Sequence, residues 1–113
     1  MLPAVAEVPE PHFVIGVTRE NRAAVVRIEG EIEFATAPRL RATLLDLAQD
    51  GAAPVVVDLA QVTFLDSAGI SLLIQAKKRL ASGDSDLVLR APQPHIRRVL
   101  EISGVTELFR IEP

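Results

Sequence analysis

Residues Pro54–Ala81 read PVVVDLAQVTFLDSAGISLLIQAKKRLA, and this stretch decides the fold. Its first part is the β-branched run Val55–Leu59, which shows no helical period and predicts a strand buried on both faces. From Ile70 onward, apolar residues recur at helical spacing and predict an amphipathic helix. A buried strand therefore leads through a loop into a helix, and the pair Asp66-Ser67 stands where that helix starts.

The start of this helix has two interpretations. Asp and Ser are residue types that cap a helix N-terminus, so Asp66 and Ser67 can both be read as caps. A serine at this place also lies near the surface, at the positive end of a helix dipole, on a rigid scaffold. The residues alone favour the capping role for Ser67, and the two roles are compatible with each other.

Composition bounds the class of protein. The chain has 113 residues, of which 49% are hydrophobic and 24% charged, and this predicts a single globular domain. A formal net charge of −3 provides no basic field for direct binding of nucleic acid. Because there is no cysteine and only two well-separated histidines, His12 and His95, neither a disulfide nor a metal site is expected.

The same sequence gives no sign of a cofactor or a membrane span. No Walker-type Gly-rich loop is present, so nucleotide binding has no support, and no Gly-x-Ser-x-Gly elbow marks Ser67 as a hydrolase nucleophile. No apolar run approaches the roughly 20 residues that cross a bilayer. The N-terminal MLPAVAEVPEP lacks the features of a secretory signal. We therefore expect a cytoplasmic binding protein without a cofactor, and no enzyme.

The segment before the central stretch predicts a hairpin. Strands are expected over Phe13–Thr18 and Ala23–Glu29, joined by a polar turn around Asn21. Gly30–Phe34 is expected to be a loop. Residues 1–11 contain three prolines and little periodicity, so we predict a mobile tail there and a folded domain over residues 12–113.

Three helices are expected in all. The first follows Thr36 as its N-cap, carries Pro38 in its first turn and stops at Gly51. The central helix ends near Gly83, and a strand follows at Asp86–Ala91. A third helix is expected from Pro94 to Gly104, before a short final strand at Leu108–Ile111. The apolar positions expected to be buried are Ile70, Leu73, Ile74 and Leu80 in the central helix and Ile96, Val99, Leu100 and Ile102 in the third. Strands that alternate with helices after a hairpin predict an α/β domain with a mixed sheet.

Four motifs, in this order and spacing, resemble the STAS domain family, specifically the stand-alone bacterial anti-sigma factor antagonists. They are Gly30–Ala37, Val55–Leu59, Phe64–Ile70 and Ile96–Gly104. The resemblance covers roughly Phe13 to Ile111, and the Asp-Ser-x-Gly between a buried strand and an amphipathic helix carries most of its weight. It implies a single STAS-type domain with amphipathic helices packed on a mixed sheet.

The resemblance also implies a switch. In this family the serine after the Asp, here Ser67, is phosphorylated by a GHKL-type serine kinase that is itself the anti-sigma factor. The unphosphorylated form binds that kinase and releases the sigma factor, and a PP2C-type phosphatase restores the form that binds. The partner-binding residues that the resemblance implies are Asp66, Ser67, Ala68, Gly69 and Ser71, with Glu31 and Glu33 on the preceding loop.

Two positions depart from the usual family pattern. The family commonly has Gly-Glu-Leu-Asp where this chain has Gly30–Glu33, so the last acid, Glu33, is one methylene longer. Ala68 replaces a frequent Ser or Thr.

Two other functions fit the same fold: a subunit of a larger assembly, such as a stressosome or a lipid-transport complex, and a small-ligand sensor that uses the groove beside the central helix.

Overall fold

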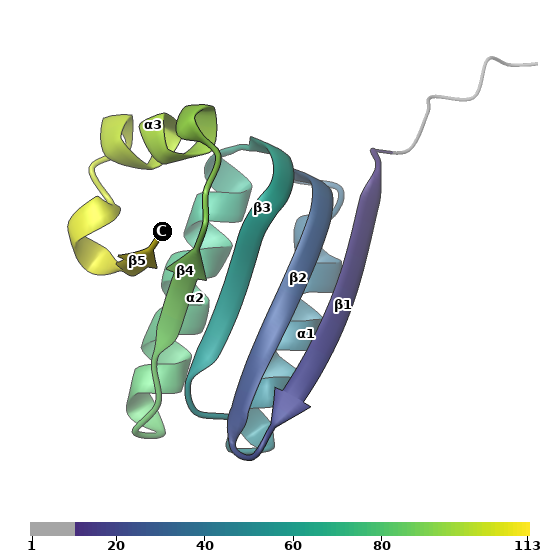
Figure 1. The fold of residues 1–113 in the computed structure, drawn as a ribbon, viewed down its shortest axis with the longest axis vertical. Coiled ribbons are helices and arrows are strands. Elements are labelled where there is room, and N and C mark those ends of the chain that lie inside the picture. The colour runs from purple at the N-terminus through teal and green to yellow at the C-terminus, as the bar shows by residue number, and fades with distance from the viewer. Residues whose placement is uncertain (1–10) are drawn as a thin grey trace, which may run out of the picture.

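The structure, a computed structural model, describes residues 11–113 (Figure 1). Along the chain the elements are β1 (Phe13–Glu20), β2 (Ala23–Ile32), α1 (Ala37–Gln49), β3 (Val55–Leu65), α2 (Ser67–Ser82), β4 (Leu87–Arg90), α3 (Pro94–Ile102), the short 3₁₀ helix η1 (Thr106–Leu108) and β5 (Arg110–Glu112). The tail expected over residues 1–11 lies, except for Pro11, outside the described residues.

The five strands form one mixed sheet in the order β1-β2-β3-β4-β5. β1 and β2 are an antiparallel hairpin, and Asn21 in its turn has the left-handed φ of 56° that such turns require. The other neighbouring strands are parallel, each joined through a helix or a helical turn. The predicted α/β fold with an initial hairpin and a mixed sheet is confirmed.

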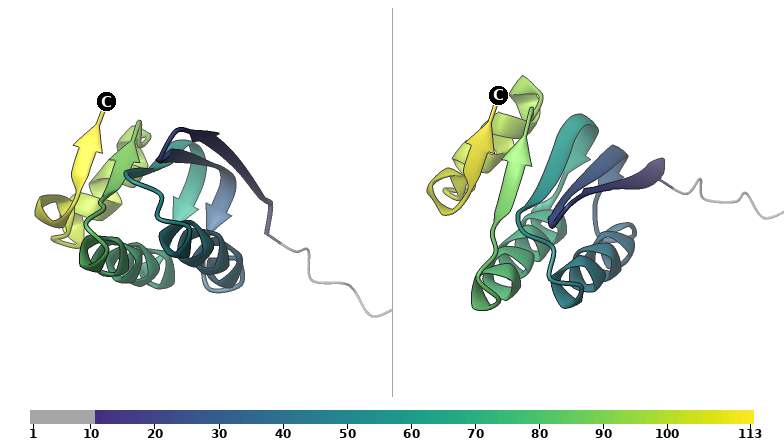
Figure 2. Two further views of the ribbon diagram at one scale, coloured as in Figure 1. Left: turned by 90° about the horizontal axis from the view of Figure 1, so that it is seen from below. Right: turned by 60° about the horizontal axis from the view of Figure 1, so that its bottom comes forward.

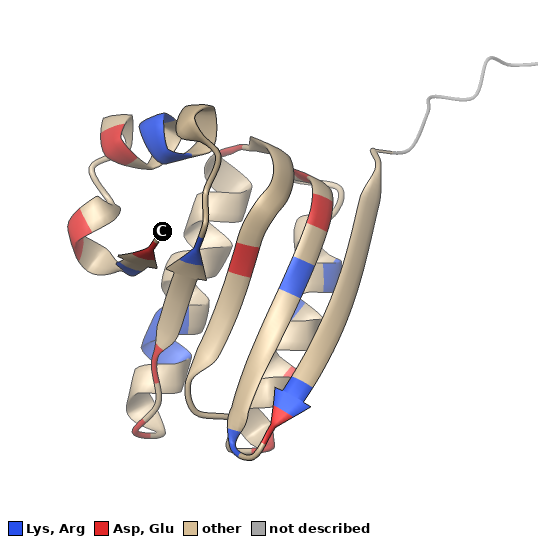
Figure 3. Cartoon of the chain, in the orientation of Figure 1, with Lys and Arg blue, Asp and Glu red and all other residues tan. Residues whose placement is uncertain are grey.

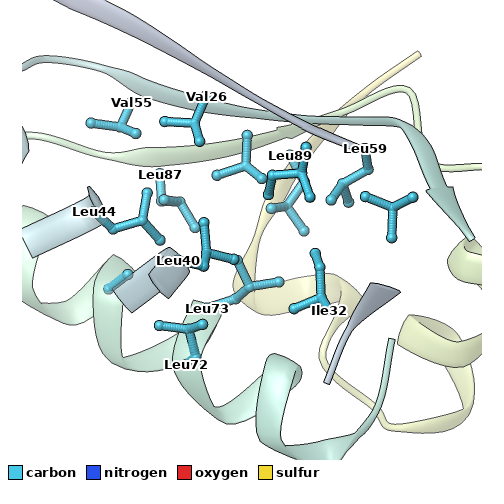
Figure 4. Packing of buried hydrophobic residues seen from close by; sticks show 14 of the residues in the cluster. Val26, Ile32, Leu40, Leu44, Val55, Leu59, Leu72, Leu73, Leu87 and Leu89 are labelled. Carbon is cyan, nitrogen blue, oxygen red and sulfur yellow. The ribbon is translucent and has the colours of Figure 1, made fainter. Parts of the chain in front are cut away.

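The core lies between the sheet and helices α1 and α2, which cover the same face (Figure 2). Strand alternation sends Val55 and Val57 into this core, where both are fully buried. From α2 the side chains of Leu72 and Leu73 join the same cluster, at 1% and 0% exposure (Figure 4). The central stretch of sequence thus supplies both layers of the core.

The opposite face of the sheet has no helix over it, and its charges alternate from strand to strand (Figure 3). In register, Arg27 of β2 lies beside Asp58 of β3, Asp58 beside Arg90 of β4, and Arg90 beside Glu112 of β5. The Arg27–Asp58 and Arg90–Glu112 pairs approach to 3.9 Å and 3.3 Å. Cross-strand pairs of opposite charge suit a sheet face that stays in water.

Two expected loop segments prove to be strand. β2 continues through Gly30 to Ile32, and β3 continues through Phe64 to Leu65, because the two strands remain paired across two register shifts. Gly30 takes a φ of 105° at one shift, where a Cβ would collide with the carbonyl oxygen of His12. The expectation of a loop over Gly30–Phe34 was wrong for its first three residues, since long-range pairing overrides the local turn signal.

Three expected core positions and the start of the final strand also differ from the prediction. Ile102 is 75% exposed, because α3 ends there and turns its last residue away from the sheet. Ile74 and Val99 are only half-buried, whereas Leu72, which was not among the expected core positions, is buried. The final strand starts two residues later than expected, at Arg110, after the helical turn η1.

A candidate protein-interaction site at the start of helix α2

The candidate site forms where two parallel strands end side by side. Ile32, the last residue of β2, pairs with Leu65, the last residue of β3. The backbone N–H of Asp66 then donates to the Ile32 carbonyl at 3.2 Å. The chain after β2 and the chain after β3 therefore leave the sheet together, which brings the loop 33–36 beside the first turn of α2.

Asp66 joins these two segments through its two carboxylate oxygens. Oδ1 accepts the N–H of Gly69 at 3.0 Å, the bond of a helix N-cap, and the backbone of Asp66 is extended as a cap requires. Oδ2 accepts the N–H of Phe34, 32 residues earlier in the chain, at 3.1 Å. One side chain thus starts the helix and tethers the loop, and the expected capping role of Asp66 is confirmed.

Ser67 is the first residue of α2 and lies exposed at the surface. Because Asp66 is the N-cap, the interpretation of Ser67 as a cap is wrong, and its hydroxyl is presented to solvent at the positive end of the helix. Ala68 is half-buried beside it, and Ser71 is exposed one turn further along.

Gly69 completes the first turn and is buried against the ends of both strands. A Cβ there would lie 2.6 Å from Leu65 Cδ1, 2.8 Å from Ile32 Cγ2 and 3.1 Å from the Ile32 carbonyl oxygen. No side chain fits at these distances without movement, so glycine is what allows α2 to start this close to the strands.

We expect Gly69→Ala to destabilise the domain by about 1–2 kcal/mol. Overpacking costs about 1–3 kcal/mol, and the better helix propensity of alanine returns part of that loss. Gly16→Ala is the matched control, since a Cβ there meets nothing within 4 Å and is expected to leave stability unchanged or slightly raised. Urea unfolding of both variants measures the difference, and equal stabilities would show that α2 does not pack as closely as described.

The loop 33–36 is held from inside by Thr36. This residue precedes α1 as expected, yet its hydroxyl does not cap the helix. Instead, Thr36 is buried, at 4% exposure. Its Oγ1 donates to the Glu31 carbonyl at 2.7 Å and accepts the Glu33 N–H at 2.9 Å. Glu33 Oε1 lies 3.3 Å from the N–H of Ala35, so this longer acid folds back onto its own loop.

The structure brings all seven predicted partner-binding residues to one end of the sheet. Five of them lie at or within the first two turns of α2, and the other two, Glu31 and Glu33, are half-buried at the end of β2 and in the loop that Asp66 tethers. Sequence reasoning missed Phe34, which is 83% exposed. The sequence does contain a signal for this residue, because an aromatic side chain in a loop outside the core is often part of a binding surface.

Residues 11–113 give little support for a metal site or for a catalytic role of His95 or Asp58. No group of three or more His, Asp or Glu side chains there could hold a metal ion. His95 Nε2 lies 2.8 Å from the Thr63 carbonyl oxygen, and Asp58 Oδ1 accepts the N–H of Ala60, so both side chains have structural partners. Within the same residues no helix is both long and apolar enough to cross a membrane.

A groove beside the central helix does exist between α1 and α2. It has a volume of about 110 Å³, and its lining residues are Arg41, Leu44, Leu45, Leu72, Gln75, Ala76 and Arg79. Sites for drug-sized ligands are about 300–1,000 Å³. The groove is therefore too small to hold such a ligand without rearrangement.

A hairpin followed by parallel strands, two helices on one face and an exposed helix start at the ends of β2 and β3 define a STAS-type α/β domain. The chain belongs to the STAS domain family, since the family model described as "Mlab, STAS domain" matches residues 15–111.

Relatives and solved structures agree with this membership. The anti-sigma-B factor antagonist of Staphylococcus aureus (strain NCTC 8325 / PS 47) is 30% identical over 97 residues, which is 86% of this chain and 90% of that protein. An anti-sigma factor antagonist from Mycobacterium paratuberculosis is 27% identical in sequence, with a TM-score of 0.82 over 90% of this chain and 86% of that one. The anti-sigma factor antagonist SpoIIAA, in its unphosphorylated form, shares the fold at a TM-score of 0.75 and 22% identity, over 87% of each chain.

Proposed function

We propose that this protein is an anti-sigma factor antagonist whose binding is switched off by phosphorylation of Ser67. The observation that carries the proposal is the position of Ser67, exposed at the first residue of α2 while its neighbour Asp66 does the capping. A hydroxyl that the fold does not need is free to be modified. The anti-sigma factor antagonists among the relatives support the same role.

The physical effect of phosphate falls on an interface more than on the fold. A phosphoserine carries a charge of about −1.5 to −2 near neutral pH. The helix dipole favours it by about 0.3–1 kcal/mol, and the carboxylate of Asp66 opposes it by a similar order at the surface. These terms roughly cancel within the domain, whereas a partner packed over Ser67 would have to desolvate the dianion.

The partners follow from the family resemblance. The unphosphorylated protein binds an anti-sigma factor that is also a GHKL-type serine kinase and so releases the sigma factor. A PP2C-type phosphatase reverses the modification. In this proposal the protein acts in the cytoplasm as a binding module without catalysis or cofactor, and Asp66–Gly69, Ser71, Glu31 and Glu33 form the partner-binding surface.

The test is affinity capture of the protein from its own cells, followed by phosphorylation in vitro by the recovered kinase and ATP. We expect wild type and Ser103→Ala to be phosphorylated at Ser67 and Ser67→Ala to remain unmodified while it still binds the kinase. Ser103 is also exposed, at the C-terminal end of α3 and outside the proposed partner-binding surface, so it controls for accessibility alone. Modification of Ser67→Ala at full rate, or no kinase among the captured proteins, would contradict the proposal.

A further inference from the structure

We propose that Phe34 anchors the binding partner and that Asp66 holds Phe34 in the position from which it binds. This inference rests on the proposed function, because it specifies how the same site recognises the anti-sigma factor kinase. The occupant of the surface is a protein with an apolar pocket that accepts an aromatic ring next to Ser67.

The exposure of Phe34 is the first observation. Phe34 is 83% exposed, which is the largest value among the exposed large hydrophobic residues of the part that the structure describes. The chain has four Phe and no Tyr or Trp, and Phe13 and Phe109 are buried in the core at 8% and 6% exposure. An aromatic ring left in water on a chain with so few aromatics has no stabilising role in the domain, while aromatic residues dominate the binding energy of interfaces.

The second observation is that the loop under this ring is fixed. The N–H of Phe34 donates to Asp66 Oδ2 at 3.1 Å, and Thr36, buried beneath the loop, bonds to the backbone of Glu31 and Glu33. The ring is therefore presented by a backbone with little conformational freedom left to lose on binding. Such preorganisation raises affinity, because ordering a loop costs free energy.

The third observation is the position of the ring relative to Ser67. The carboxylate that holds Phe34 belongs to the residue immediately before Ser67. A partner that encloses the ring must exclude water around it, and its surface then extends over the serine. A phosphate on Ser67 would be desolvated by that same surface, which gives the switch a local cause.

The first experiment compares variants by calorimetric titration with the unphosphorylated protein and the anti-sigma factor kinase recovered in the capture experiment. Phe34→Ala is expected to weaken binding at least about 30-fold, the loss of an interface hot spot. Phe34→Leu should restore part of the affinity. The matched control is Ile102→Ala, which removes an apolar side chain of 75% exposure at the end of α3 and should bind as wild type does.

The kinase reaction supplies a second measurement. For Phe34→Ala we expect KM for phosphorylation of Ser67 to rise while kcat is unchanged, because the ring contributes to binding and does not touch the reacting hydroxyl. Its melting temperature should match that of wild type, since an exposed side chain is removed. The phosphate should also weaken the binding of Phe34→Ala by a smaller factor than it weakens the binding of wild type.

The role of Asp66 is tested by Asp66→Asn. Asn is as good an N-cap as Asp, but its single amide oxygen can serve only one of the two N–H groups, those of Gly69 and Phe34. We expect faster hydrogen exchange at the Phe34 amide, preserved exchange at Gly69 and a several-fold loss of affinity, smaller than that of Phe34→Ala. Unchanged affinity would remove Asp66 from the proposal as a positioning residue.

The outcomes distinguish a failure of this inference alone from a failure of the proposed function on which it rests. If wild type binds the kinase and Phe34→Ala binds equally well, the anchor is wrong and the proposed function stands. If Phe64→Ala, at the half-exposed ring on β3, loses the affinity instead, the anchor lies elsewhere and the inference fails. If wild type itself does not bind, both fail together.

Discussion

Phosphorylation of Ser67 is expected to lower the affinity for the anti-sigma factor kinase at least about 100-fold, equivalent to about 2.7 kcal/mol. A single unpaired charge buried at an interface accounts for a loss of this size. Ser67→Glu should weaken binding less than the phosphate does, because it adds one charge instead of nearly two. Titration calorimetry of the unmodified, phosphorylated and Ser67→Glu forms measures these differences directly.

The fold should be preserved during this loss of binding. Because the helix dipole and Asp66 act on the phosphate in opposite directions, the phosphorylated domain should melt within a few degrees of the unmodified one. Circular dichroism of both forms is the control. Equal affinities would exclude the switch, whereas lost affinity with a collapsed spectrum would show that phosphate acts on the fold.

Leu73→Ala is expected to destabilise the domain by about 2–5 kcal/mol. Leu73 is fully buried on the face of α2 that meets the sheet, so truncation leaves a cavity among side chains that relax only in part. Ile74→Ala is the matched control on the next residue, where the side chain is half-buried and the loss should be smaller. Urea unfolding measures both losses of stability. A loss below about 1 kcal/mol for Leu73→Ala would show that the face of α2 that carries Leu73 does not pack against the core.

Much of the fold could be predicted from local pattern. The run Val55–Leu59 has no helical period and was correctly predicted to be a strand, with Val55, Val57 and Leu59 fully buried. The expected burial on both faces holds only in part, because no helix covers the other face, where Asp58 is half-buried. The helix that begins after Asp66, with Gly83 at its C-terminal end, followed from capping types placed around an apolar stripe. The element bounds that failed, at Gly30–Phe34 and Leu108–Ile111, are places where pairing with a distant strand decides the structure.

In the candidate site, too, some features follow from the local sequence and others from the tertiary structure. The sequence by itself placed Asp66 and Ser67 at the start of α2, because capping depends on residues within one turn, but it favoured Ser67 as a cap, and the structure assigns the N-cap to Asp66. Only the tertiary structure decided that the second oxygen of Asp66 reaches Phe34, 32 residues away, and that this ring remains in water. Both facts depend on β2 and β3 ending side by side, and no local pattern encodes the meeting of segments that are far apart along the chain.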